Sequence, residues 1–130
     1  MDTTKRVLLV DDDDDVLEQL TMIFEAEGFQ VKTAGSRAEG EDALLGYHPD
    51  ICVFDLMMEE TDAGFVLSRT AKKFYPEVPV ILLTGVVSAT GMDFRPKTEA
   101  ARAWIKADVI LDKPVRAEQV REEVRRLLNV

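Results

Sequence analysis

The sequence predicts a doubly wound α/β domain, in which a parallel five-stranded sheet carries helices on both faces. Two observations support this fold class. Short apolar runs recur along the chain without alternating apolar and polar residues, which is typical of strands buried on both faces. Segments with helical periodicity separate these runs, as the crossovers between parallel strands require. The predicted strands are 7–10, a weaker 31–34, 51–54, 80–83 and 109–111.

The helices are predicted from apolar periodicity and from the residues that end them. The first follows Asp14 and ends at Gly28, and the second covers 38–45. The third begins near Ala63 and closes before Pro76. The stretch 86–96, after the fourth strand, has no clear apolar periodicity and is predicted to be a loop. A further helix is expected over 97–106. The apolar sides are assigned to Phe65, Val66 and Phe74 in the third helix, and to Val120, Val124, Leu127 and Leu128 in a last helix over 117–128.

Composition limits the possible functions. The 130 residues, 46% of them apolar, suit a single domain over 1–130. The net charge of −9 disfavours direct binding to nucleic acid or anionic membranes. Neither a membrane-spanning run nor a signal-peptide pattern is present, so a cytoplasmic protein is expected. The single cysteine, Cys52, lies in an apolar run and is interpreted as a buried thiol.

Polar residues follow four of the five predicted strands. Asp11 and Asp12 come after the first, Asp55 after the third, Thr84 ends the fourth and Lys113 follows the fifth. Because parallel strands end at the same edge of a sheet, these side chains should meet there. Carboxylates gathered in one cleft repel one another unless a cation lies among them, and hard oxygen ligands suit Mg²⁺. The pattern therefore predicts a magnesium site.

Such a site is suited to phosphoryl transfer. Mg²⁺ held by few protein oxygens keeps positions open for phosphate oxygens, and a lysine adds a second positive charge. A carboxylate nucleophile then needs little more than a hydroxyl donor. Asp55, Lys113 and Thr84 are the candidates for the acceptor, the cation and the hydroxyl.

Four motifs in this order resemble a response-regulator receiver domain of the chemotaxis-regulator type, and the resemblance covers essentially the whole chain. They are VLLVDDD at 7–13, VFDLMM at 53–58 with Gly64 following, VILLTG at 80–85 and LDKPV at 111–115. The resemblance implies a flavodoxin-like strand order of 2-1-3-4-5.

The resemblance also implies a set of metal ligands. Asp12 would bind Mg²⁺ directly, Asp11 would act mostly through water, and Asp55 would be both ligand and phosphoacceptor. The main-chain oxygen of Met57 would complete the protein ligands.

The remaining site residues are assigned in the same way. Thr84 would bond one phosphoryl oxygen and Lys113 would pair with another, and the Lys113–Pro114 peptide bond would be cis. The implied donor is a histidine kinase or phosphotransfer protein carrying phosphohistidine, with small phosphodonors as further sources. An output domain or a downstream protein would receive the signal. The domain would catalyse only its own phosphorylation and slow dephosphorylation.

Several positions depart from the family pattern. Glu59 replaces the usual proline after the acceptor, and Ala63 stands where glycine is common. Ile110 occupies the position of the aromatic switch residue. The stretch 86–96 is longer than in typical members, which indicates a remodelled output face.

These departures leave alternatives. A pseudo-receiver, which binds partners but is never phosphorylated, is favoured slightly by Glu59, Ile110 and the longer stretch 86–96. The phosphorylated receiver is favoured more, by the intact Asp11–Asp12 pair with Asp55, Thr84 and Lys113. A metal-dependent phosphohydrolase, with Asp55 as covalent nucleophile, is a weaker alternative. It would need a carboxylate as general acid/base at position 57, where this chain has Met57. The acidic run 11–15 has a bland interpretation as a solvated helix cap, and we apply it to Asp13–Asp15 alone.

Two side chains predict a long-lived phosphorylated state. The resemblance places Met57 and Val86 beside the path of the water that hydrolyses the aspartyl phosphate, and neither side chain orients water by hydrogen bonding. The lifetime is measured by following the phosphoryl group in purified protein with Mg²⁺ alone. Rapid loss would refute the prediction.

Overall fold

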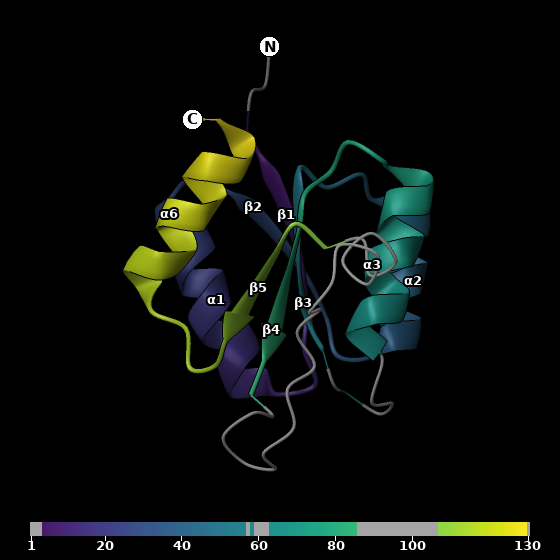
Figure 1. Ribbon diagram of the computed structural model, residues 1–130, viewed down its shortest axis with the longest axis horizontal. Coiled ribbons are helices and arrows are strands. Elements are labelled where there is room, and N and C mark those ends of the chain that lie inside the picture. Colours follow the sequence, from purple (N-terminus) through teal and green to yellow (C-terminus); the bar gives the residue numbers. More distant parts are fainter. Residues whose placement is uncertain (1–3, 57, 59–62, 86–106, 130) are drawn as a thin grey trace, which may run out of the picture.

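The computed structural model describes residues 4–56, 58, 63–85 and 107–129, which form a parallel five-stranded sheet with helices on both faces (Figure 1). The strand order β2-β1-β3-β4-β5 confirms the predicted fold and order. The strands are β1 (Arg6–Val10), β2 (Gln30–Ala34), β3 (Ile51–Asp55), β4 (Val80–Thr84) and β5 (Val109–Asp112).

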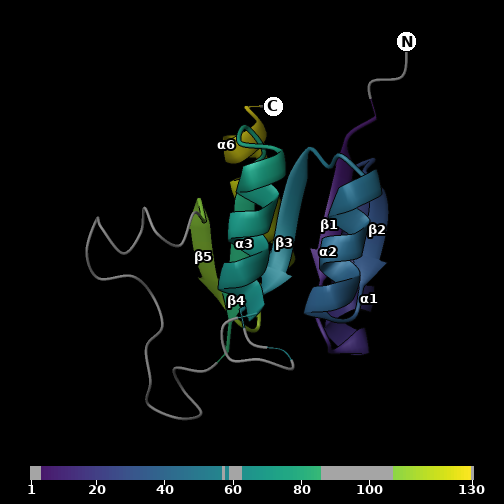
Figure 2. The ribbon, with the colours of Figure 1, turned by 90° about the vertical axis from the view of Figure 1, so that its right-hand side faces the viewer.

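The helices form two layers. Figures 1 and 2 show α1 beside α6 on one face of the sheet, and α2 beside α3 on the other. No helix in the described part of the chain is long and apolar enough to cross a membrane. The stretch 86–96 and the helix predicted over 97–106 lie outside the described residues. The helix bounds are α1 (Asp14–Ala26), α2 (Arg37–Gly46), α3 (Ala63–Phe74) and α6 (Ala117–Leu128).

Each face of the sheet has its own hydrophobic core, because successive strand residues point to opposite faces. In β1, Val7 and Leu9 pack toward α1 and α6, whereas Leu8 and Val10 pack toward α2 and α3. All four are at most 1% exposed. This double burial explains why the apolar runs do not alternate. In β2, at the edge of the sheet, Ala34 alone is buried, which accounts for its weaker apolar run.

The start of α1 confirms the capping role assigned to the acidic run. Asp13 is the N-cap, and its side chain accepts a hydrogen bond from the main-chain N–H of Asp15. Asp14 and Asp15 lie in the first turn, where negative charge is favoured by the helix dipole. The helix ends at Ala26, and Gly28 takes the positive φ of 85° that lets the chain turn toward β2.

The predicted apolar side of α3 is confirmed only in part. Phe65 is partly buried and packs against the core beneath α2 and α3, whereas Val66 is only partly buried and Phe74 is 43% exposed. The reason is that the stripe of α3 nearest the sheet is made of mostly small residues, which let the helix approach closely. The buried residues of α3 are Ala63, Gly64, Leu67, Ser68 and Ala71.

The predicted apolar side of α6 is confirmed. Val120 and Val124 are buried, and Leu127 and Leu128 pack against the same core. Cys52 is also buried, as expected.

Two helical phenylalanines test this core assignment. Phe24 of α1 is 1% exposed and packs edge-on against Phe29 at 5.2 Å between ring centroids. We expect Phe24→Ala to lower the free energy of unfolding by about 3–5 kcal/mol. Phe74→Ala, the matched change at an exposed helix position, should cost less than about 1 kcal/mol. Urea denaturation measures both, and equal losses would contradict the assignment.

Candidate functional site

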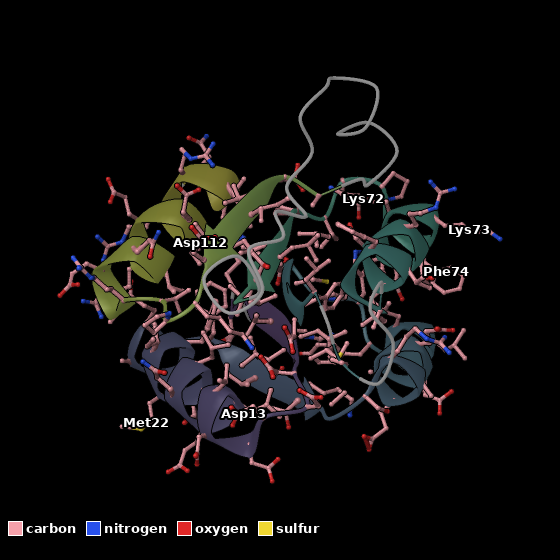
Figure 3. All side chains as sticks on the ribbon, turned by 60° about the horizontal axis from the view of Figure 1, so that its bottom comes forward. Asp13, Met22, Lys72, Lys73, Phe74 and Asp112 are labelled. Carbon is pink, nitrogen blue, oxygen red and sulfur yellow. The ribbon has the colours of Figure 1, made fainter. Side chains whose placement is uncertain are left out.

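The candidate site lies at the carboxyl edge of the sheet, where β1, β3, β4 and β5 end. Figure 3 turns this edge forward and labels Asp13 by the start of α1 and Asp112 by the end of β5. The sheet order reverses between β1 and β3, so the edge beside them is a topological switch point. The structure brings Asp11, Asp12, Asp55, Thr84 and Lys113 to this edge, as the sequence predicts.

Three carboxylates form an acidic cluster, which we define as Asp11, Asp12 and Asp55. One oxygen from each lies within 4.8 Å of the other two. Asp11 is 1% exposed and Asp55 5% exposed, whereas Asp12 faces solvent. The acidic cluster thus consists of two buried carboxylates and one that is exposed to solvent.

Local hydrogen bonds fix Asp11. Its main-chain N–H donates to the carbonyl of Ala34 at 3.2 Å, which continues the pairing of β1 with β2. Its Oδ1 accepts the main-chain N–H of Asp13 at 2.9 Å. The turn that leads into α1 therefore also orients the first carboxylate of the cluster.

Lys113 joins the two buried carboxylates. Its Nζ lies 2.9 Å from Oδ2 of Asp11 and 3.3 Å from Oδ1 of Asp55. The main-chain N–H of Lys113 donates to the carbonyl of Thr84 at 2.7 Å, so β4 holds the lysine in place. The Lys113–Pro114 bond is cis, as the resemblance implied.

Burial and like charge raise the pKa of Asp55 to about 7. Removal from water is the larger cause, the charge of Asp11 adds to it, and Lys113 opposes both. Burial alone would lower the pKa of Lys113. The hydrogen bond to Asp11 and the charges of Asp55 and Asp11 outweigh burial and raise the pKa of Lys113.

The acidic cluster fits a divalent cation. A single lysine cannot balance three ionised carboxylates, so the ionised cluster keeps an excess of negative charge. Apart from its ion pair with Lys113, the buried Oδ2 of Asp11 has no hydrogen-bond partner among the described residues. Closely spaced carboxylate oxygens are the donors that hard cations prefer.

Thr84 ends β4 and is 1% exposed, in register with Asp112 of β5. Ile110, at the position expected for a switch residue, is partly buried against the core beneath α2 and α3. Met57, Glu59 and Val86 lie outside the described residues.

The sequence analysis noted Gly64 only as the glycine that follows the second motif and assigned it no role in the site. The structure places it directly against the backbone of the acceptor: a Cβ at Gly64 would lie 2.6 Å from the carbonyl oxygen of Asp55. Ala63, noted as a departure from the family's glycine, is fully buried. A glycine at the start of the predicted third helix could have indicated this close approach of the helix to the backbone of the acceptor.

The fold and the site define a doubly wound α/β domain with an acidic, lysine-linked cluster at its switch point. The chain belongs to the response regulator receiver family. The family model described as "Response regulator receiver domain" matches residues 7–125, which confirms the resemblance inferred from the four motifs.

Curated relatives include regulators from several bacteria. RegA, a photosynthetic apparatus regulatory protein of Cereibacter sphaeroides, is 31% identical over 89% of this chain and 59% of its own length. Response regulator MprA of Mycobacterium sp. (strain KMS) is 30% identical over 95% of this chain and 50% of its own length. The transcriptional regulatory protein GlrR of Escherichia coli K12 is 42% identical over 60% of this chain and 17% of its own length. The chain thus spans less than two thirds of each relative.

Solved structures agree with this assignment. A CheY-like receiver domain protein from Methanospirillum hungatei JF-1 matches with a TM-score of 0.83 and 25% identity, covering 98% of this chain and 95% of that one. The signal receiver domain of a histidine kinase from Syntrophus aciditrophicus matches with a TM-score of 0.78 and 28% identity, covering 97% and 91%.

The raised pKa of Asp55 predicts how stability depends on pH in metal-free protein. An unfolded aspartate has a pKa of about 3.9, so the folded state holds this proton more tightly. The resulting stabilisation is complete below about pH 4 and is lost as pH rises through 7. Between pH 5 and pH 8, the free energy of unfolding should fall by on the order of 2 kcal/mol relative to Asp55→Asn, which carries no such charge.

Urea denaturation in EDTA at each pH measures this difference. Asp42→Asn, at an exposed position of α2, is the matched control and should follow the wild type. If the free energy of unfolding depended on pH in the same way in the wild type and in Asp55→Asn, burial would not raise the pKa of Asp55 and the prediction would be wrong.

Proposed function

We propose that this receiver domain accepts a phosphoryl group on Asp55 from a histidine kinase or phosphotransfer protein, with Mg²⁺ as its cofactor. The observation that carries the proposal is the position of Lys113, whose Nζ contacts both Asp11 and Asp55. This contact links the acceptor Asp55 to Asp11 and supplies a cation for a phosphoryl oxygen.

The metal would be held by Asp11, Asp12, Asp55 and the main-chain oxygen of Met57. When bound, Mg²⁺ would supply positive charge to the oxygens of the transferred phosphoryl group. Asp12 is the exposed member of the cluster, which suits it to meet an incoming cation. Asp11 is held by the N–H of Asp13 and so presents a fixed oxygen.

In the transfer step, a carboxylate oxygen of Asp55 attacks phosphorus. The new P–O bond forms as the P–N bond of the donor phosphohistidine breaks, and the electron pair of that bond returns to the imidazole. Lys113 remains beside Asp55 and neutralises a phosphoryl oxygen, while the hydroxyl of Thr84 donates to another. The protein thus mainly positions charge.

The proposal extends to partners and location. RegA, MprA and GlrR are named as regulators, and each is longer than the matched region. We therefore assign the output to a further domain or a downstream protein. The net charge of −9 argues against direct contact with nucleic acid or membrane, and a cytoplasmic location suits such a module. The domain would catalyse only its own phosphorylation and slow dephosphorylation.

The decisive measurement is the intact mass after incubation with acetyl phosphate and Mg²⁺. The wild type should gain the mass of one phosphoryl group, and Asp55→Asn should gain none because it lacks the nucleophile. EDTA should prevent the gain, and Lys113→Ala should slow it at least about tenfold. Asp42→Asn should behave as the wild type.

Other outcomes would support the alternatives. A wild-type chain that stays unmodified with acetyl phosphate and with phosphorylated kinase would be a pseudo-receiver. Sustained turnover of a generic phosphoester would instead indicate a phosphohydrolase.

A further inference from the structure

The second residue of α3 rests directly on the backbone of the proposed acceptor. The main-chain N–H of Gly64 donates to the carbonyl of Leu56 at 2.8 Å. A Cβ added to Gly64 would lie 2.6 Å from both the Asp55 carbonyl oxygen and Leu56 Cα, and 3.1 Å from the Asp55 carbonyl carbon. Since Cβ contacts below 3.0 Å essentially never occur, any side chain here requires the backbone to move.

The backbone under Gly64 has little freedom to yield. Asp55 is paired with Leu83 of β4, and the N–H of Leu56 donates to the carbonyl of Leu83 at 2.8 Å. Leu56 is 1% exposed and Leu67, one turn along α3, is fully buried. A Cβ would therefore move either the end of β3 or the start of α3, and both changes disturb the support of Asp55.

We propose that Gly64 is a positioning residue for phosphorylation, which sets the place of the Asp55 carboxylate relative to Asp11 and Lys113. This inference rests on the proposed function. Lys113 lies 3.3 Å from Asp55 and 2.9 Å from Asp11, so a shift of about 1 Å at Asp55 would break the shared contact. Displacements of that size can cost up to about 100-fold in rate.

Two other helical glycines provide matched controls. A Cβ at Gly40 of α2 would meet side-chain atoms, Leu67 Cδ2 at 3.0 Å and Val10 Cγ2 at 3.1 Å. A Cβ at Gly46, the last residue of α2, would meet nothing within 4 Å. Neither these two glycines nor Gly64 has positive φ, so alanine can adopt the native backbone conformation at all three positions. The three variants therefore differ mainly in the space around the added Cβ.

The experiment compares Gly64→Ala, Gly40→Ala and Gly46→Ala by three measurements: urea stability, the Kd for Mg²⁺ by calorimetry, and the phosphorylation rate with acetyl phosphate at saturating Mg²⁺. Gly64→Ala should lose at least about tenfold in rate and bind Mg²⁺ severalfold more weakly. Gly40→Ala should lose stability but keep the rate and Kd within about twofold, because its Cβ meets side-chain atoms and not the backbone of Asp55 or Leu56. Gly46→Ala should match the wild type in phosphorylation rate and in Kd for Mg²⁺.

A folded Gly64→Ala protein with wild-type rate and Kd would overturn the inference, however large its loss of stability. If Gly64→Ala is unfolded in buffer, the same comparison is made for all proteins in trimethylamine N-oxide, which favours the folded state. Failure of the wild type to accept a phosphoryl group would instead overturn the proposed function. The Mg²⁺ Kd of Gly64→Ala still tests the placement of Asp55 in that case.

Discussion

The contact of the Lys113 ammonium with the carboxylates of Asp11 and Asp55 is the interaction on which the site depends. Two carboxylates that are 1% and 5% exposed cannot both be ionised at low cost without a cation nearby. Lys113 meets this need in part, at 2.9 Å and 3.3 Å. The remaining negative charge makes the edge receptive to a divalent cation and, through it, to a phosphoryl group.

The parallel sheet brings these three groups together from distant parts of the chain. β1 and β3 are neighbours; Asp11 directly follows β1 and Asp55 is the last residue of β3. β4 holds Lys113 through the carbonyl of Thr84. Local structure then refines each position. The turn into α1 orients Asp11 through the N–H of Asp13, and the start of α3 lies against the backbone of Asp55. Helix starts on both faces of the sheet thus support one site.

The sequence predicted well those features that depend on a repeated pattern of apolar residues. It predicted poorly those that depend on how closely a helix approaches the sheet. The apolar runs predicted all five strands, and Asp13 was recognised as part of a helix cap. The buried side of α3 was misassigned to bulky residues such as Phe74, because periodicity weighs hydrophobicity but not the room between a helix and a sheet. Gly64 was noted beside a motif but given no role in the site for the same reason: its importance lies in the absence of a side chain at a close approach.

By itself, the sequence determined the fold class, the five polar residues at the strand ends and the family, because strand burial and strand-end position leave direct marks in residue order. Only the tertiary structure decided which groups touch. It showed that Lys113 contacts Asp11 and Asp55 together, that Asp12 faces solvent, and that Gly64 lies on the acceptor backbone. These are distances between segments far apart in the chain, which packing sets and residue order does not record.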